Sequence, residues 1–556
     1  MRQRLFFILA AVLAACGGGG HGGGSSSADT DPPEVQLGER LFLETRFAQF
    51  FSAHSTGDVN APLAAGDPVM DDSATTGDPL PGPFRGQSMN CRACHLVDEL
   101  QDEAGGGVRT YNDFARRSPV PARGDQATMT ARNSPPLVGS TLPRDVPFML
   151  HFDGEFPTTA DLVRGTLTGR NFGWLPTEGA MAVAHIAAVI RNDDGTGELA
   201  SEFEGSLPYR VAFLGTDPSI PAAVRIPPQY RIDVTQASDA QVLDAVAQLV
   251  AAYVESLLFS TDAAGANNGS PYDRFLRKNG LPRAPAPAEG ESKASYAARL
   301  RGLVQALKKP AFVQANEGQF EFHDQPFQFG ATELEGLKIY LSVPGDVISA
   351  GQGVGNCVSC HVAPDFTDFR FHNTGASEQE YDALHGTGAF ASLNIPDLAT
   401  RTASFDAYLP PSPAHPTATG AFRSAPAADK PGYTDLGVWN VFANPDIPDP
   451  QSALTELLCT EFQIPVETCT PDVLLPLTVG LFKTPTLRDL GQSQPFFHTG
   501  QIDSIEDAVQ FYITVSTLAR QGRIRNGAAE LADIVIGQGD IAPLAAFLRS
   551  LNEDYS

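Results

Sequence analysis

The chain has 556 residues, a net charge of −27, and many glycines (52) and prolines (44). A chain of this length predicts two or more domains with cores of their own. The negative charge argues against a nucleic-acid partner, because such proteins present a basic surface to the phosphate backbone. Strand signals are scarce, and the glycines and prolines indicate long loops, so we expect a mainly α-helical protein.

Residues 1–16 have the pattern of an export signal. Two arginines precede an apolar run that is too short to span a bilayer and ends in small residues. Cys16 follows Leu-Ala-Ala, which resembles a bacterial lipobox and predicts a lipid anchor; cleavage nearby, with an incidental cysteine, is the alternative. Residues 17–32 predict a flexible Gly/Ser-rich tether. No later segment predicts a membrane span, so we expect a periplasmic or cell-surface protein that meets the membrane only through lipid.

The chain carries two Cys-x-x-Cys-His motifs, Cys91–His95 and Cys357–His361. Two thiols at this spacing can form thioether bonds to one haem, and the histidine then becomes an axial ligand of the iron. A zinc knuckle or a redox dithiol is the alternative, but zinc needs four ligands in two close pairs, and these motifs lie far apart. The sequence therefore predicts two covalent c-type haems, held by Cys91, Cys94, His95, Cys357, Cys360 and His361.

Of the 7 cysteines, Cys459 and Cys469 remain after the motifs and Cys16. In an oxidising compartment they predict a disulfide that closes one proline-rich loop. Two free thiols are the alternative.

The chain also reads as two related halves. Similar apolar helical patterns precede the two motifs, at residues 37–42 and 335–340, and further helices are expected at 294–307, 504–509 and 541–551. We expect an N-terminal haem domain at 33–316 and a C-terminal haem domain at 317–556.

Further segments resemble the bacterial di-haem cytochrome c peroxidases and their relative MauG. They are residues 130–137, 151–155, 365–368, 371–375, 482–489 and 495–500. The resemblance leaves 170–320 and 376–475 as insertions. It implies a mainly α fold of two cytochrome c-like haem domains with long loops and insertions. It also implies Ca²⁺ between the domains, bound by the Asn133 side chain and the carbonyls of Ser493 and Pro495; the alternative is that these residues only shape turns.

The resemblance also bears on the ligands of the second iron. All six methionines lie in the first half of the chain, so a His/Met pair at the second haem is not expected. The family's ligand position falls on Tyr512, and MauG-like proteins also use tyrosine there. A phenolate would lower the reduction potential of that haem. The alternatives are a packed core tyrosine, or ligation by His498 or His385.

The first haem is expected to be open to small ligands. Resting peroxidases have a second histidine a short loop after the motif, but residues 96–113 contain none, and the next are His151 and His185. His185 is interpreted either as a buried structural residue or as a distal ligand or acid/base group. The family's distal acid/base residues are not matched, which leaves Asp161, Arg170 and His185 as candidates.

The sequence differs from the di-haem peroxidase family at two positions in the region expected between the haems. The family often has a tryptophan where this chain has Phe152, and an arginine where it has Glu155. Phenylalanine is a much poorer electron relay than tryptophan. Trp174 is the candidate replacement.

The resemblance implies a peroxidase with His95, Phe152, Trp174 and His185 at its catalytic centre. Electrons from a small cytochrome or cupredoxin would enter at the His361 haem and reduce hydrogen peroxide at the His95 haem. One alternative is a MauG-like or oxygenase-type enzyme that uses peroxide or dioxygen on an organic or protein substrate. Another is a non-enzymatic electron-transfer cytochrome with two six-coordinate irons.

Overall fold

The structure is a computed structural model. It describes residues 31–70, 87–95, 117–125, 127–202, 206–218, 220–286, 290–320, 323–346 and 351–554, and short strands within 72–81 and 99–109. The predicted export signal, Cys16 and most of the tether lie outside these residues. So does most of the 96–113 segment on which the open first haem was predicted. None of the described helices is both long and apolar enough to cross a bilayer.

The fold is mainly helical, as predicted. The helices up to residue 256 are α2 (Pro33–Phe42), α3 (Gln49–His54), α4 (Thr159–Leu167), α5 (Gly179–Asn192), α6 (Glu198–Glu202), α7 (Tyr209–Leu214) and α8 (Asp239–Ser256). Those that follow are α9 (Pro271–Lys278), α10 (Lys293–Ala306), α11 (Ala331–Leu341), α12 (Ala376–His385), α13 (Leu398–Ala403), α14 (Phe405–Tyr408), α15 (Gln451–Glu461), α16 (Pro471–Leu474), α17 (Ile505–Arg520) and α18 (Ile541–Arg549). The helices predicted at 37–42, 294–307, 335–340, 504–509 and 541–551 are confirmed. The spans 294–307 and 541–551 agree with α10 and α18 to within two residues at both ends, whereas α2 and α11 begin four residues earlier than predicted and α17 continues to Arg520.

The described strands form three short antiparallel pairs. They are β1 (Asp72–Thr75) with β2 (Asp78–Pro81), β3 (Glu99–Leu100) with β4 (Val108–Arg109), and β5 (Phe371–His372) with β6 (Phe482–Lys483). The third pair joins two segments that carry the family resemblance. It brings His372 opposite Phe482 and Phe371 opposite Lys483.

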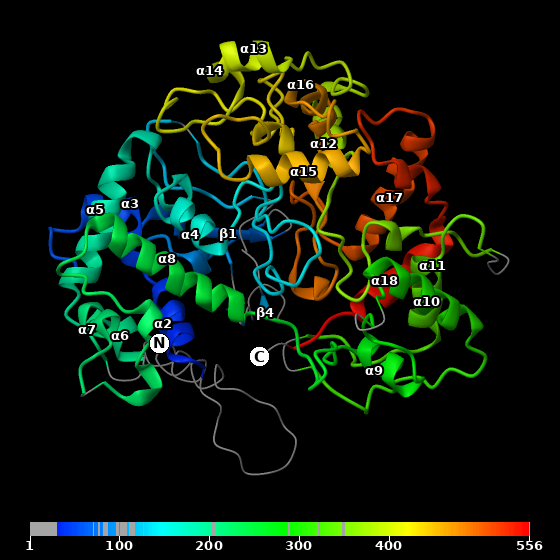
Figure 1. Ribbon diagram of the computed structural model, residues 1–556, viewed down its shortest axis with the longest axis horizontal. Helices are drawn as coiled ribbons and strands as arrows, with labels where there is room; N and C mark the ends of the chain where they lie inside the picture. Colours follow the sequence, from blue (N-terminus) through cyan, green and yellow to red (C-terminus); the bar gives the residue numbers. More distant parts are fainter. Residues whose placement is uncertain are drawn as a thin grey trace.

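The described residues form three main hydrophobic cores. Figure 1 shows α2–α8 on the left, α9–α11 with α17 and α18 on the right, and α12–α16 across the top. The first core contains Leu41 and Val246 and extends to Phe259, whereas the second begins at Tyr272 and contains Leu337 and Phe547. Helices α9 and α10 therefore pack with the second half. Apart from Phe369, which packs in the first core, the change of core falls between residues 259 and 272, and the domain boundary at 316/317 stays a prediction.

One helix crossing is repeated in the two halves. In the first, α2 packs on α8, and a Cβ added to Gly38 would lie 2.1 Å from the Leu249 carbonyl oxygen. In the second, α11 packs on α18, and a Cβ added to Gly336 would lie 1.9 Å from the Pro543 carbonyl oxygen. Real side chains do not approach backbone this closely, so both crossings require glycine. The two halves are therefore structurally related, as the repeated sequence pattern predicts.

The third core is built from the predicted insertion at 376–475 and its flanks. Trp439 and Leu454 are fully buried in it, next to Phe371 of β5. Cys459 and Cys469 form the predicted disulfide, with an S–S distance of 2.02 Å. The bond closes a loop between α15 and α16. The insertion is thus a packed subdomain that covers the top of both halves in Figure 1.

Candidate functional site

The two motifs adopt the same local structure. Each forms a 3₁₀ turn, Cys91–Ala93 and Cys357–Ser359, and an asparagine precedes each turn. The histidine N–H donates to the carbonyl of the first cysteine in both, at 3.0 Å in the first motif and 2.9 Å in the second. This turn places both thiols and the histidine on one short loop. A haem-attachment motif requires that arrangement.

The side chains of the asparagines hold the turns in place. Asn90 accepts a hydrogen bond from the Ala93 N–H at 2.9 Å and donates to the Leu43 carbonyl at 2.8 Å. Asn356 donates to the Glu530 carbonyl at 3.0 Å and accepts from the Ser359 hydroxyl at 2.8 Å. Each attachment loop is therefore fixed to its own half. The sequence analysis did not single out either asparagine.

His361 is oriented as an axial ligand would be. Its Nδ1 lies 3.0 Å from the Phe366 carbonyl oxygen, so the Nδ1–H donates and Nε2 keeps its lone pair. A backbone carbonyl in this position is the usual partner of a metal-ligating histidine. Burial lowers the pKa of His361, while the carbonyls of Phe366 and Pro485 oppose this shift. The ring is therefore neutral and available to bind iron through Nε2.

His95 lies in a similar environment. Burial lowers its pKa to about 4, the Pro135 backbone carbonyl opposes the shift, and the nearby ring of His151 adds to it. A histidine with such a low pKa is neutral at physiological pH. It can therefore act as a metal ligand.

The four motif thiols fit thioether attachment. They are free and half-buried, whereas Cys459 and Cys469 are bonded to each other. Burial raises the pKa of Cys91 to about 12, that of Cys94 to about 11 and that of Cys357 to about 12. Neutral thiols in apolar surroundings suit addition to a vinyl group. They do not suit a zinc site, which stabilises thiolates.

Tyr512 lies near the second motif. It is on α17, burial raises its pKa, and Cys360 and Cys357 add to this rise. The two alternative ligands are placed differently. His498 is buried, stacks on Phe482 with ring centroids 3.5 Å apart, and its Nε2 is hydrogen-bonded to the Ser377 hydroxyl at 2.9 Å. His385 packs on Tyr381 within α12 at 4.3 Å. Ligation by Tyr512 remains a prediction, and this geometry favours it over the two histidines.

His185 and Trp174 lie together in the first core. Their rings are 5.9 Å apart, and Nε2 of His185 is 2.7 Å from the Arg46 carbonyl oxygen. That contact favours the structural interpretation of His185. Trp174 is 1% exposed, and its indole N–H has no hydrogen-bond partner among the described residues. Its ring neighbour belongs to its own half, so the contacts do not support a relay role between the halves.

The other two distal candidates form ion pairs near the surface. Asp161 pairs with Arg164 at 2.7 Å on α4, and Arg170 pairs with Asp125 at 2.6 Å. Neither contact involves His95 or its neighbours. The structure therefore does not gather Asp161, Arg170 and His185 into one acid/base site.

Phe152 lies where the first half contacts the second, a region that we call the seam. Its ring is 6.2 Å from that of His498, and its carbonyl accepts a hydrogen bond from the Lys483 backbone N–H at 2.7 Å. Next to it, Glu155 contacts His151 at 3.1 Å and Arg423 at 2.5 Å. A guanidinium from the insertion, that of Arg423, thus lies beside position 155, where the resemblance implies an arginine. Sequence reasoning noted Glu155 as a departure but could not find its partner, which is 268 residues away.

A second ion-pair group stabilises the same seam. Arg132 bridges Asp153 at 2.6 Å and Asp435 at 2.5 Å, and all three side chains are buried. His151, Asp153 and Glu155 offer donor atoms close enough to hold a metal ion. Arg132 and Arg423 offset their charge, so we interpret the group as an ion-pair network.

His372 lies beside the second thioether position. Its Nε2 is 2.7 Å from an Asp368 carboxylate oxygen, and its ring also contacts Cys360. Burial lowers the pKa of His372, but Asp368 and Cys360 outweigh it and raise the pKa to about 11. Cys360, His372 and Glu530 could together hold a metal ion. A Cys360 that is bound to haem would not act as a ligand in such a site.

The predicted calcium ligands are partly brought together. The side-chain amide of Asn133 lies 2.5 Å from the Pro495 carbonyl oxygen and 3.4 Å from that of Phe497. The other end of this amide, Oδ1, is buried without a hydrogen-bond partner. An orphaned oxygen beside converging carbonyls suits a hard cation. The Ser493 hydroxyl donates to the Asp489 carbonyl at 2.7 Å, and no described contact places its own carbonyl in the group.

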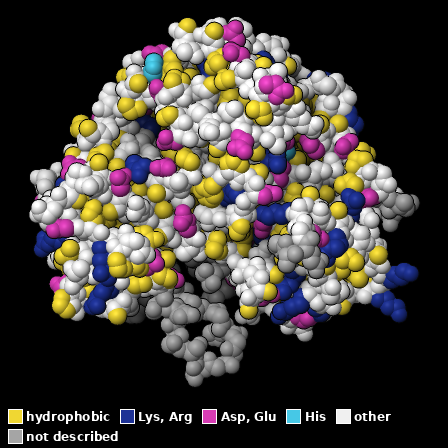
Figure 2. Space-filling model, viewed as in Figure 1, with side chains coloured by type: hydrophobic (Ala, Val, Ile, Leu, Met, Phe, Trp, Pro, Cys, Tyr) yellow, Lys and Arg dark blue, Asp and Glu magenta, His cyan; other side chains and the backbone are white. Residues whose placement is uncertain are grey.

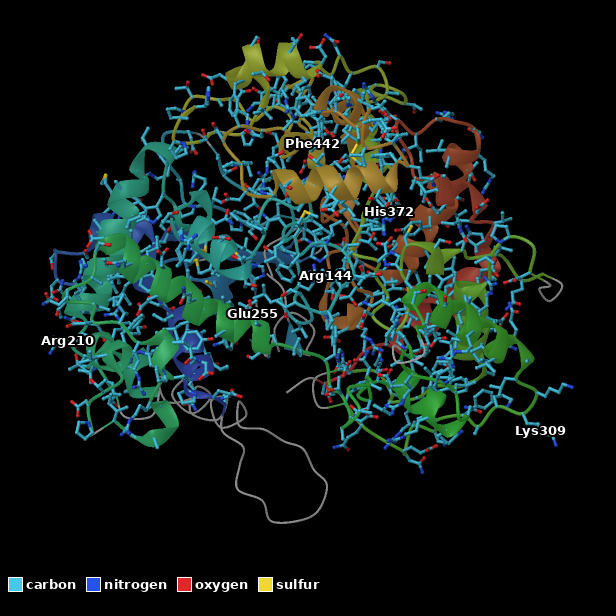
Figure 3. The ribbon with its side chains drawn as sticks, viewed as in Figure 1. Arg144, Arg210, Glu255, Lys309, His372 and Phe442 are labelled. Atoms are coloured by element: carbon cyan, nitrogen blue, oxygen red, sulfur yellow. A yellow bond between two sulfur atoms is a disulfide. The ribbon has the colours of Figure 1, made fainter. Side chains whose placement is uncertain are left out.

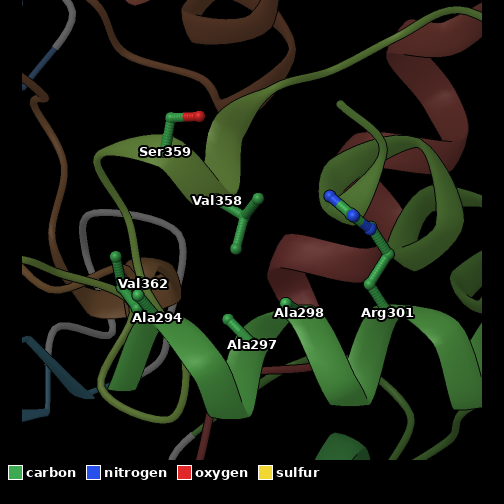
Figure 4. Close-up of a pocket in the computed structure, with 7 residues that line it drawn as sticks. All are labelled: Ala294, Ala297, Ala298, Arg301, Val358, Ser359 and Val362. Carbon is green, nitrogen blue, oxygen red and sulfur yellow. The ribbon is translucent and has the colours of Figure 1, made fainter. Parts of the chain in front are cut away.

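The two motifs differ in depth. Ala93 of the first motif is 1% exposed, whereas Ser359 at the same position of the second is exposed. Figure 4 shows an open cavity of about 170 Å³ between the second motif and α10, lined by Ala294, Ala297, Ala298, Arg301, Val358, Ser359 and Val362. On the face in Figure 2, acidic and basic side chains are interspersed. At this one position the second attachment loop is more accessible to a partner than the first.

Comparisons with known proteins give weak likenesses. No family model matches the chain. A MauG-like protein associated with microbial copper homeostasis is 15% identical, with a TM-score of 0.41 over 94% of this chain and 91% of that chain. The diheme peroxidase BthA from Burkholderia thailandensis E264 is 17% identical, with a TM-score of 0.43 over 94% and 87%. Because these TM-scores are below 0.5, the functional proposal rests on the residues of the site.

One curated relative belongs to a different class of protein. Flap endonuclease 1 of Methanothrix thermoacetophila (strain DSM 6194 / JCM 14653 / NBRC 101360 / PT) is 26% identical over 194 residues, which is 32% of this chain. The chain spans about half the length of that relative, 55%. We do not propose a nuclease activity, because a net charge of −27 opposes binding to a polyanion.

Proposed function

We propose that the chain is a di-haem c-type oxidoreductase that reduces hydrogen peroxide. The observation that carries the proposal is the repeated turn with two free thiols and a neutral histidine, each in its own half. Cys91, Cys94 and His95 would hold one haem, and Cys357, Cys360 and His361 the other. When bound, haem supplies one-electron transfer and an iron position at which peroxide can react.

The depth of the two motifs supports the direction of electron flow. Peroxide reduction consumes two electrons and two protons and yields two water molecules. The exposed second motif, next to the cavity beside α10, suits electron entry from a small cytochrome or cupredoxin. Ala93 of the first motif is buried, and this burial supports a reaction with peroxide that is shielded from bulk water. Between them the seam at Phe152 fixes the two halves through Arg132, Asp153 and Asp435.

The decisive experiment compares the resting ferric protein before and after peroxide by electron paramagnetic resonance. The pyridine haemochrome should count two haems per chain, and the reduced protein should consume one peroxide per two electrons. A high-spin signal that binds cyanide without prior reduction indicates an open first site. A count below two haems contradicts the proposal.

A second function is favoured by Tyr512. Its position beside Cys357 and Cys360 supports a tyrosinate ligand, which stabilises higher oxidation states of iron. We therefore keep a MauG-like oxidation of an organic or protein substrate, with peroxide or dioxygen as oxidant, as the alternative. Two wholly low-spin irons without peroxide turnover indicate an electron-transfer cytochrome instead.

Calcium and export belong to the same proposal. The Asn133 amide and the Pro495 carbonyl support a Ca²⁺ site, and chelation should lower activity and be reversed by added Ca²⁺. The sequence around Cys16 supports export and lipidation. Cys16→Ala should move the protein from the membrane fraction to the soluble periplasmic fraction.

A further inference from the structure

Arg144 is a half-buried cation that forms no ion pair among the described residues. Its guanidinium donates to the carbonyls of Leu142 at 3.2 Å and Ser140 at 2.6 Å, and Nη1 is buried without a hydrogen bond. The rings of Phe148 and Phe369 lie 4.4 Å and 3.9 Å from its central carbon. One ring comes from the first half and the other from the second. Figure 3 shows Arg144 in the middle of the molecule.

Lys483 on β6 is a second such cation. Its Nζ donates to the Met149 carbonyl at 3.0 Å, and among the described residues it forms no ion pair. Burial and the charge of Arg144 together lower its pKa to about 7, although the charge of Asp153 opposes the shift. Burial likewise lowers the pKa of Arg144 to about 10, although the negative charge of Asp365 opposes this shift. Two like charges thus lie close together at the seam.

Three other buried guanidiniums have carboxylates, whereas Arg401 is held by backbone carbonyls. Arg40 pairs with Asp193, Arg132 with Asp153, and Arg488 with Asp273. The acids near the two cations are already engaged, because Asp153 binds Arg132 and Asp365 binds Lys293 at 2.7 Å. Buried charges are normally paired, since an unpaired one loses its hydration without compensation. In the part of the chain that the structure describes, no carboxylate is therefore left to pair with Arg144 or Lys483.

We propose that Arg144 and Lys483 bind a carboxylate, and that it is a propionate side chain of a haem. The inference rests on the proposed di-haem function. Lys483 lies two residues before Pro485, whose carbonyl faces His361, and Met149 lies two residues before His151, whose ring affects His95. The pair thus lies between the segments that hold the two iron ligands. A guanidinium with a free N–H and a nearby ammonium suit a carboxylate.

The test uses the haem-loaded protein and the variants Lys483→Met, Arg144→Met and Lys483→Arg. The two methionine variants should shift the propionate bending band in resonance Raman spectra. They should also lower the midpoint potential of the nearer haem, because losing a positive charge favours the ferric state. Lys483→Arg should retain both wild-type values. Arg401→Met is the matched control, because this buried arginine is also held by carbonyls, those of Trp439, Phe442 and Ala443, but it lies in the third core.

Each result has a distinct meaning. Unchanged Raman bands and potentials in Lys483→Met and Arg144→Met overturn the haem assignment. If sodium acetate then stabilises the wild type against heat more than sodium chloride does, and neither variant responds, the carboxylate comes from solution. If neither response is seen, or if Arg401→Met causes the same shifts, the site is refuted. A pyridine haemochrome count below two contradicts the di-haem proposal itself, independently of these variants.

Discussion

The two halves of the protein share a turn and a helix crossing but differ in how deeply the turn is placed. Asn90 and Asn356 precede the same Cys-x-x-Cys-His structure, and Gly38 and Gly336 allow the same close approach of helices. Ala93 is nevertheless buried, while Ser359 is exposed beside a cavity. If each turn holds a haem, as proposed, the same attachment chemistry would serve two roles. Their surroundings would then set those roles, and four groups of variants test how the two halves differ.

The largest effect is expected from removing one attachment site. Cys357→Ala with Cys360→Ala should leave one haem per chain and abolish peroxide turnover with a protein donor, because electrons no longer enter at the exposed site. Cys91→Ala with Cys94→Ala should also leave one haem, which the donor still reduces while peroxide is not consumed. Haem content and stopped-flow reduction measure both. Cys459→Ala with Cys469→Ala is the control and should retain two haems. Two haems in either motif variant would contradict the assignment.

The next effect concerns the ion pair that joins the first half to the insertion. Glu155→Gln leaves Arg423 with only its longer contact to Asp153, at 3.5 Å, and should cost about 3–5 kcal/mol in the free energy of unfolding. Burial raises the pKa of Glu155, but Arg423 and His151 outweigh it and hold the pKa well below 4.5. The stabilisation is therefore present above about pH 4.5 and lost as the pH falls.

Urea unfolding from pH 7 to pH 3 measures this effect. The wild type should lose stability more steeply than Glu155→Gln on acidification. A double-mutant cycle with Arg423→Gln separates the pair from its surroundings. If the free energy of unfolding falls equally steeply with pH in the wild type and in Glu155→Gln, the ion pair contributes nothing to stability in acid.

A smaller effect is expected at the repeated crossing. Gly38→Ala and Gly336→Ala should each cost about 1–3 kcal/mol, because the added methyl group meets backbone that must move. The control is Gly302→Ala in α10, where a Cβ meets nothing within 4 Å. It should gain about 0.5–1 kcal/mol from helix propensity. Thermal unfolding of the haem-loaded protein gives the three values. If Gly336→Ala lowers the free energy of unfolding and Gly38→Ala does not, the two crossings are not equivalent.

These features differ in how far sequence could reveal them. The motifs, the disulfide between Cys459 and Cys469, and the paired helices are local patterns, and local spacing predicts them. The contact of Glu155 with Arg423 could not be predicted, because it depends on how the insertion folds back on the seam. The depth of Ser359 and the assignment of α9 and α10 to the second core are also tertiary properties. Helical periodicity shows that a face is buried but not which neighbour buries it.

The smallest change tests what distinguishes the second iron from the first. Tyr512→Phe removes one oxygen and should leave the free energy of unfolding nearly unchanged. If the phenolate binds iron, its loss removes an anionic donor, so the potential of the second haem should rise and its low-spin resonance should shift. The first haem should keep its signal, which makes it an internal reference. Tyr381→Phe, in α12, is the control and should alter neither haem. An unchanged spectrum and potential in Tyr512→Phe would make Tyr512 a packing residue. The two irons would then differ through their depth alone, because the contacts of His498 and His385 leave neither well placed to replace Tyr512.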